Sequence, residues 1–314
     1  MKYKPLISII IPVYNGSNFV EEAIQSALAQ TYDNFEIIVV NDGSSDGGAT
    51  ERIVLKYENE LKYISKQNGG VSSALNEGIK AASGEWVSWL SHDDLYFPNK
   101  LEYQVSFLNE LIDKHIDITT VLLHSATIRI NKDGQIISKK IAKIPKNLSP
   151  HQTLIFHIKN YNLGGCTVLA RKDSLINAGL FDEDNRTVSD AKMWFGLLID
   201  NFNFFYTKKP LVKSRQHKMQ VGNRCYDLFV EEHAQLMKEI ANKMIQSFKT
   251  KELKKAYGAF LHSGHREAAG IIKKHLICSN SYSNFAMFFV TAYNSTYFSL
   301  RAFLKRIYRK LTLK

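Results

Sequence analysis

The first hundred residues alternate between short apolar runs and helix-like segments, and this alternation constrains the fold more than any other feature. Continuous apolar, β-branched runs predict strands at residues 7–15, 35–40 and 85–91, and the segment 62–65, "KYIS", predicts a further short strand. The segments between them predict helices over residues 17–30, 49–57 and 68–84. Strands of this kind, alternating with helices, are typical of a mostly parallel sheet covered by helices on both faces.

Polar residues follow three of these strands, in the loops 14–15, 41–43 and 92–94. Ligands of such sheets bind at the carboxyl ends of the strands. We therefore expect the three loops to meet over one edge and to bring their three aspartates, Asp42, Asp93 and Asp94, close together. Clustered carboxylates repel one another unless a cation or a hydrogen-bond donor lies among them.

A divalent cation that shares phosphate oxygens with the protein is one solution to this repulsion. The segment Asn68-Gly69-Gly70 opens the third helix and offers backbone N–H groups nearby as a seat for an anion. No GxGxxG follows the first strand, which disfavours a classical dinucleotide fold, and no GxxxxGK[ST] is present, which excludes a P-loop. Taken alone, the segments Asn41–Ser44, Asp93-Asp94 and Gly69-Gly70 are common as turns, caps or packing sites, so the signal lies in their order and spacing.

Compartment signals are simple. The three cysteines, Cys166, Cys225 and Cys278, are far apart and form no CxxC pair, which favours a reducing cytoplasm. "MKYKPLISII" has no small-residue cleavage site, so we expect no signal peptide.

At this point the chain resembles family 2 glycosyltransferases with the GT-A, nucleotide-diphosphosugar transferase fold. The resemblance is carried by "SIIIPVYNG", "IIVVNDGSSDG", "QNGGVSSALNEGIKAASGEWVSWLSHDD" and "FPNKLE", in that order. It continues through "GGCTVLARKDSLINAGLFDE" and ends near "SRQHKMQVG". It implies a GT-A domain over residues 1–222, followed by a helical, basic region over residues 223–314.

The resemblance also implies a site for a nucleotide-sugar donor. Pro12, Tyr14 and Asp42 match positions that hold the nucleotide base, and Asp42 would accept a hydrogen bond from a pyrimidine N3–H. Arg215 and His217 would lie near the diphosphate. The full set of residues expected to bind the donor is Pro12, Tyr14, Asn15, Asp42, Asn68, Gly70, His92, Arg215 and His217.

"SHDD" occupies the place of the family's Asp-x-Asp metal signature. Asp93 corresponds to the carboxylate that coordinates Mn²⁺ or Mg²⁺, and His217 is the second expected ligand. Ser91 stands where the usual form has its first acidic residue, which leaves fewer carboxylates at the site. A cation here would neutralise the leaving nucleoside diphosphate. We expect Asp94 to cap the following turn or to orient Asp93.

The resemblance assigns the general base to Asp190, which begins an amphipathic helix in "FDEDNRTVSDAKMWFGLL". Its position alone predicts a helix N-cap, and the two roles are compatible. A single displacement by the acceptor oxygen inverts the anomeric centre and requires no covalent nucleophile. Cys166, in the strand-like run "GGCTVLA", is expected to be a small core residue.

Positive charge is concentrated at the C-terminus. Residues 251–314 hold twelve Lys or Arg and two acidic residues, a net +10 of the chain's +11, which favours an anionic partner. Residues 281–300 are uncharged, but their Ser, Asn and Thr content argues against a spanning helix. Residues 300–311 place six apolar side chains on one helical face and five cations on the other, a pattern typical of an interfacial membrane helix. The alternative is a helix that packs on the protein and solvates its cations.

We interpret the chain as a metal-dependent inverting glycosyltransferase. It would move a sugar from a nucleotide-diphosphosugar, UDP-sugar by family habit, to a saccharide or lipid-linked saccharide in surface polysaccharide or glycan synthesis. We expect it in the cytoplasm at the inner face of the cell membrane. A nucleotidyltransferase of similar fold would need a basic, glycine-rich loop after the first strand, and "PVYNGSNFVEE" is not basic. A nucleic-acid-binding protein is the other alternative, weakened because aromatics and cations are segregated in the tail.

Overall fold

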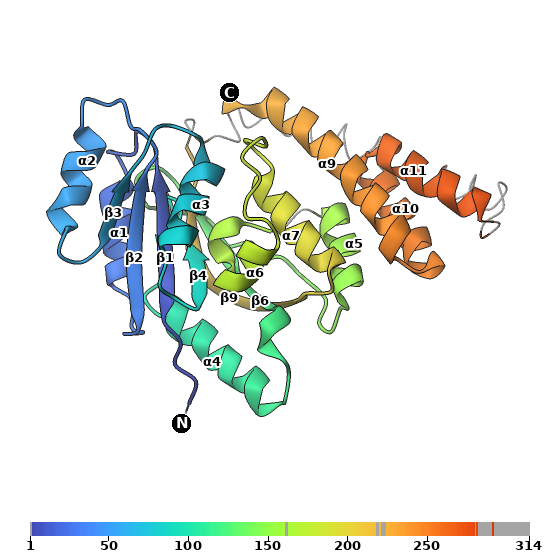
Figure 1. Ribbon diagram of the computed structural model, residues 1–314, viewed down its shortest axis with the longest axis horizontal. Coiled ribbons are helices and arrows are strands. Elements are labelled where there is room, and N and C mark those ends of the chain that lie inside the picture. The colour runs from blue at the N-terminus through green and yellow to red at the C-terminus, as the bar shows by residue number, and fades with distance from the viewer. Residues whose placement is uncertain are drawn as a thin grey trace. The chain divides into compact units, whose positions relative to one another are not determined.

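The computed structural model describes residues 2–160, 163–217, 220, 224–279, 281 and 291 (Figure 1). The chain divides into two compact units. The first comprises Met1–Asn147, Leu163–Leu197 and Phe202–Phe229, and the second comprises Leu148–Asn162, Leu198–Asn201 and Val230–Lys314. The second unit thus takes in a segment from the middle of the chain, and the predicted assignment of function to residues 1–222 stays a prediction.

A mixed sheet forms the centre of the first unit. Within the described residues it has nine strands in the order β3-β2-β1-β4-β8-β6-β9-β5, with β7 paired to β6. The strands are β1 (Ile7–Val13), β2 (Phe35–Asn41), β3 (Lys62–Ser65), β4 (Trp86–Trp89), β5 (Leu95–Tyr96), β6 (Val121–Ile130), β7 (Ile136–Ser138), β8 (Leu169–Arg171) and β9 (Asn203–Arg215). Strands β1 to β4 are mutually parallel, as predicted, and lie side by side in Figure 1. Strand β8 runs antiparallel to both of its neighbours.

Helices cover both faces of the parallel part because its strands are apolar on both faces. Every residue of β1 is buried. Ile9 and Ile11 belong to the cluster that includes α1 (Val20–Leu28), whereas Ile10 belongs to the cluster that includes α3 (Val71–Ala81). Close approach of α3 depends on Gly78, where a Cβ would lie 2.4 Å from Ile10 Cγ2.

The predicted helices are present, with shorter bounds. The other helices of the first unit are α2 (Ala49–Val54), α4 (Lys100–Asp113), α6 (Lys172–Asn177) and α7 (Ser189–Ile199), whose last two residues belong to the second unit. The third predicted helix begins only after Gly70, whose φ of 90° is not helical. The strand-like run around Cys166 is instead a 3₁₀ turn, Gly165–Thr167, followed by β8, and Cys166 is buried as expected.

The second unit is helical. It contains α5 (Pro150–Asn160), α10 (Thr250–Ser263) and α11 (Arg266–Cys278), together with most of α9 (Tyr226–Ser247). Helix α5 packs on α10, where His151 Nδ1 lies 3.1 Å from Glu252 Oε1. The predicted amphipathic face over residues 300–311 lies outside the described residues. Among the helices that are described, none has the length and apolar content needed to cross a membrane.

Candidate active site

The loops that follow β1 and β2 are joined by hydrogen bonds at the carboxyl edge of the sheet. The Asn15 N–H donates to Ser44 Oγ at 2.9 Å, and Asn15 Oδ1 accepts from the Ser45 N–H at 2.7 Å. Asn15 adopts a left-handed φ of 49°, a conformation that asparagine tolerates. Pro12 is buried in β1, whereas the neighbouring Tyr14 is 44% exposed. The Tyr14 ring is therefore available at this edge to a planar ligand.

The loop that follows β4 reaches the same place. A Cβ added at Gly16 would lie 2.6 Å from His92 Cδ2 and 2.4 Å from Val13 Cγ2, so only glycine lets the His92 ring approach this closely. Burial lowers the pKa of His92, and the positive form of His217 nearby acts in the same direction, while Asp93 opposes both. The prediction that loops from different strands converge here is confirmed, whereas the closeness of Asp42 to Asp93 and Asp94 stays a prediction.

Asp42 lies in a ring of donors. Its Oδ1 accepts from Lys66 Nζ at 2.9 Å and from the Gly69 N–H at 3.0 Å, and its Oδ2 accepts from the Gly70 N–H at 2.7 Å. Asn68 Nδ2 donates to the Asp42 carbonyl at 2.9 Å. The seat predicted for an external anion is thus filled by the protein's own carboxylate. Asn68 and Gly70 build the surroundings of Asp42, and their contact with a donor phosphate stays a prediction.

Asp93 pairs with His217 across the site. Asp93 Oδ2 lies 2.9 Å from His217 Nε2, and the two side chains are 13% and 12% exposed. Within the described part of the chain, no group of three or more His, Cys, Asp and Glu side chains could hold a metal ion. One carboxylate and one imidazole fit a divalent cation only when diphosphate oxygens and water complete its coordination shell.

Arg215 holds the Asp93 loop in place through hydrogen bonds. Its guanidinium is fully buried and donates to the Asp93 carbonyl at 2.9 Å, the Lys132 carbonyl at 2.7 Å and Glu22 Oε2 at 2.8 Å. Its backbone N–H donates to Asp94 Oδ1 at 2.8 Å. All three guanidinium nitrogens are therefore engaged within the protein. The predicted contact between Arg215 and the diphosphate stays untested, and the structure shows Arg215 as a support for Asp93.

Asp94 and Cys166 extend this support. Burial raises the pKa of Asp94 to about 7, and the negative charge of Asp93 adds to the shift. Cys166 Sγ lies 3.1 Å from Ser91 Oγ and 3.3 Å from the Ser91 backbone N. Ser91, which stands in place of the family's first acidic residue, is thus hydrogen-bonded to a buried thiol. Asp94 connects the loop to the end of β9 through its hydrogen bond with the Arg215 N–H.

Asp190 lies in the first turn of α7, half-buried. Desolvation raises its pKa to about 6, and its Oδ1 accepts from the Ala191 N–H at 2.7 Å. The preceding Ser189 places its Oγ 2.7 Å from Ser72 Oγ in the first turn of α3. Because α3 begins directly after Gly70, this link brings the start of α7 to the edge where Asp42 lies.

Comparison with known proteins decides the family. The family model described as glycosyl transferase family 2 matches residues 8–175. This chain belongs to glycosyltransferase family 2. An uncharacterized glycosyltransferase from Rickettsia typhi is 43% identical to it over 236 residues, which are 74% of this chain and 70% of that protein. The minor teichoic acid biosynthesis protein GgaB of Bacillus subtilis is 35% identical over 193 residues, which are 59% of this chain and 20% of GgaB.

The fold of this glycosyltransferase is shared with solved structures. TarS 1–349 of S. aureus, in complex with UDP-GlcNAc, matches with a TM-score of 0.60 at 22% identity, over 82% of this chain and 71% of that chain. This likeness shows the GT-A fold. The chain spans only 31–35% of the length of three further relatives from Rickettsia species, so it corresponds to part of those longer proteins.

Sequence reasoning missed two residues of this glycosyltransferase site. Lys66 follows β3 directly, at the same edge as the predicted loops, and that position was the available signal. Glu22 is the carboxylate partner of Arg215, although it looks like one solvated residue among several on α1. No local pattern indicates a partner 193 positions away.

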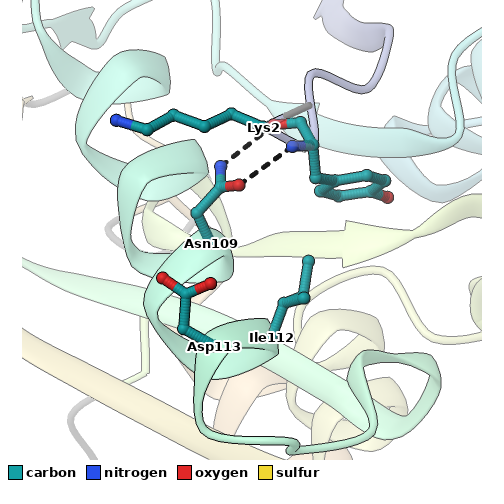
Figure 2. Close-up of a pocket in the computed structure, with 5 residues that line it drawn as sticks. Lys2, Asn109, Ile112 and Asp113 are labelled. Carbon is teal, nitrogen blue, oxygen red and sulfur yellow. Dashed lines mark hydrogen bonds between the residues drawn. The ribbon is translucent and has the colours of Figure 1, made fainter.

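A separate cavity lies elsewhere in the glycosyltransferase. It has a volume of about 510 Å³ and is lined by Lys2, Tyr3, Asn109, Ile112 and Asp113 (Figure 2). The backbone N–H of Tyr3 donates to Asn109 Oδ1, and Asn109 Nδ2 donates back to the Tyr3 carbonyl, each at 2.9 Å. Because Tyr3 precedes β1, the cavity adjoins the amino end of that strand, away from the carboxyl edge. It contains none of the predicted site residues.

Proposed function

We propose that this glycosyltransferase moves a sugar from a nucleotide-diphosphosugar to a hydroxyl group of a saccharide, with inversion at the anomeric carbon. The observation that carries the proposal is the Asp93–His217 pair, 2.9 Å apart at the edge where the loops after β1 and β4 converge. A carboxylate–imidazole pair suits a cation whose ligand brings its own phosphates.

The donor base would be held by Tyr14 and Asp42, above the buried Pro12 and beside Asn15. A carboxylate offers about four acceptor positions, and three of those on Asp42 are used by Lys66 and two backbone N–H groups. The remaining position on Oδ2 accepts, and cannot donate, so it favours a base edge that carries an N–H. Uracil N3–H, thymine N3–H and guanine N1–H all meet this requirement, so the choice of UDP-sugar as the proposed donor rests on the habit of the family.

Asp93 and His217 would hold a divalent cation, Mn²⁺ or Mg²⁺, together with the donor diphosphate. Such a cation, when bound, neutralises the charge that develops on the leaving diphosphate. Arg215 and Asp94 keep the Asp93 loop fixed through its carbonyl and through the end of β9. His92 is held neutral by its lowered pKa, which lets it accept or donate a hydrogen bond at the ribose side.

Asp190 would act as the general base. As the acceptor oxygen forms its bond to the anomeric carbon, the bond from that carbon to the diphosphate oxygen breaks, and Asp190 takes the hydroxyl proton. Its pKa of about 6 is close to neutral pH, where a base is both ionised and still basic enough to be effective. The chemistry needs no covalent intermediate.

The acceptor we propose is a saccharide or lipid-linked saccharide of a surface polymer. The name of the relative GgaB, a teichoic acid biosynthesis protein, supports a polymer of that kind. Residues 223–314 would form an accessory region, and the cationic, amphipathic residues 300–311 would contact the cytoplasmic leaflet of the membrane. We accordingly propose that the catalytic residues 1–222 work at the inner face of the cell membrane.

A thermal-shift panel tests the donor class. UDP-, GDP- and dTDP-sugars are each added with Mn²⁺ or with EDTA, and nucleoside triphosphates and a short RNA serve as the alternatives. A ligand that binds only the folded state raises Tm. We expect a Mn²⁺-dependent rise with a UDP-sugar. A rise with triphosphates alone would indicate a nucleotidyltransferase, and a rise with RNA alone would indicate a nucleic-acid-binding protein.

A further inference from the structure

The hairpin formed by β6 and β7 ends in an exposed apolar pair. Ile136 is 49% exposed and Ile137 is 56% exposed. Neighbouring residues of a strand point to opposite faces, so β7 presents an isoleucine on each of its two faces. Within the described residues β7 pairs only with β6, which leaves it as a free strand at the margin of the sheet.

Lysines flank this pair in the sequence. Residues 131–146 contain five lysines, all exposed, and one acidic residue, Asp133, a net +4. Asp133 pairs with Lys132 at 3.1 Å. Among the described residues no ion pair joins the other four to an acidic side chain. These four are Lys139, Lys140, Lys143 and Lys146.

Lysines on an edge strand also discourage pairing between copies of a protein. Two exposed isoleucines on the same strand would favour such pairing, so protection of the strand edge does not explain why they are there. Exposed apolar side chains close in sequence to exposed cations match the composition of surfaces that bind anionic lipid, with apolar groups at the acyl boundary and cations at the phosphates.

The hairpin is attached directly to the support of the Asp93 loop. Arg215 Nη1 donates to the Lys132 carbonyl, while Arg215 Nε donates to the Asp93 carbonyl. The Gln216 N–H donates to the Ile130 carbonyl at 2.8 Å, at the end of β6. A surface that holds the hairpin would therefore hold the metal-site loop beside it.

We propose that the β6–β7 hairpin docks on an anionic phospholipid surface through the free edge of β7, so that Ile136 and Ile137, one on each face of the strand, both reach the headgroup boundary and the lysines lie at the phosphates. This contact is independent of the proposed reaction and of residues 300–311. A polyanionic saccharide or a nucleic acid would engage the lysines and leave both isoleucines in water. The isoleucines therefore favour lipid.

A local probe in the full chain tests the contact. Ile137→Trp places an indole on the hairpin, and Ile176→Trp places one at another exposed isoleucine, 42% exposed in α6, as the matched control. Each variant is mixed with equimolar phosphatidylglycerol and phosphatidylcholine vesicles whose acyl chains are brominated. We expect blue-shifted emission and quenching for Ile137→Trp, beyond the parent signal, and neither change for Ile176→Trp.

Charge variants measure how much each lysine contributes to vesicle affinity. Replacing Lys139 and Lys140 with Gln should weaken vesicle affinity about fivefold for each lysine, which corresponds to the ~1 kcal/mol of a cation at an anionic surface. Both side chains are exposed, so Tm should not change. Absence of quenching for Ile137→Trp while the protein still pellets with vesicles would overturn the proposal, because the contact would then lie elsewhere. The proposal would also be overturned if replacing Lys139 and Lys140 left vesicle affinity unchanged but weakened binding to soluble polyphosphate.

Discussion

Arg215→Lys separates two roles for Arg215, that of a diphosphate ligand and that of a buried support. The substitution keeps the positive charge but replaces a planar fork by a single ammonium. One ammonium cannot reproduce the three directions in which Arg215 donates, to Asp93, Lys132 and Glu22. Because Lys132 and Asp93 lie on opposite sides of the guanidinium fork, reached by Nη1 and Nε, we expect one of these two carbonyls to lose its donor.

The magnitude follows from burial. A buried acceptor left without a donor costs about 1–3 kcal/mol of the free energy of unfolding. The Glu22 side chain is 50% exposed, so its ion pair with Arg215 adds less than about 1 kcal/mol. For a unit of this size the loss corresponds to a fall in Tm of about 3–10 °C. Loosening the Asp93 carbonyl should also weaken Mn²⁺ affinity about 10–100-fold, as is usual when a group that orients a metal ligand is removed.

The assay combines thermal unfolding with Mn²⁺ titration of sugar transfer. Glu21→Gln is the matched control, because it removes an exposed ion pair with Lys56 from the same helix and leaves every partner of Arg215 in place, so it should shift Tm by much less. If Arg215→Lys unfolds at the temperature of the parent protein and loses UDP affinity in the absence of metal, then Arg215 contacts the diphosphate and the support argument is wrong.

Further variants test the remaining parts of the site. Asp93→Asn should abolish Mn²⁺-dependent turnover with the fold intact by circular dichroism; EDTA-insensitive activity in the parent protein would contradict the metal assignment. Asp190→Asn should lower kcat about 10²–10⁴-fold while calorimetry shows unchanged UDP binding. Because the base must be deprotonated, kcat/KM of the parent should fall tenfold per pH unit below the Asp190 pKa of about 6, and a profile flat down to pH 5 would exclude this assignment. The same raised pKa means that the folded state binds a proton that the unfolded state lacks between about pH 4 and pH 6. Stability should therefore decrease with rising pH across that window, and Asp190→Asn should remove this component in urea titrations. Deleting residues 300–314 should reduce pelleting with anionic vesicles and preserve activity towards a short soluble acceptor; equal pelleting of both chains would show that the tail packs on the protein.

The parallel half of the fold follows from sequence because three of its strands are continuous apolar runs and the fourth, β3, lies between two predicted helices. The rest of the sheet does not. Strand β5 has two residues and β8 has three, too few for any periodicity to be recognised. Helix α5 joins the second unit through contacts with α10, which lies about a hundred positions later in the chain.

For the site, the sequence predicted residues but not their mutual contacts. Asp42 and Gly70 were each predicted to bind the donor, yet Asp42 accepts the Gly70 N–H itself. Arg215 was predicted to lie near the diphosphate, but it is fully buried, and acceptors far away in the sequence compensate for the desolvation of its charge. Such pairings depend on tertiary structure, which no spacing along the chain encodes.

The hydroxyl pair between Ser72 and Ser189 has a consequence for redesign. Because this buried link, 2.7 Å long, joins α3 to α7, the helix that carries the proposed general base Asp190, it fixes the distance between the starts of the two helices. A bulkier acceptor cannot be accommodated by spreading the two helices apart without breaking it. Libraries that aim at new acceptors should therefore keep both serines and vary the exposed approach to α7, at positions such as Asp184 and Arg186.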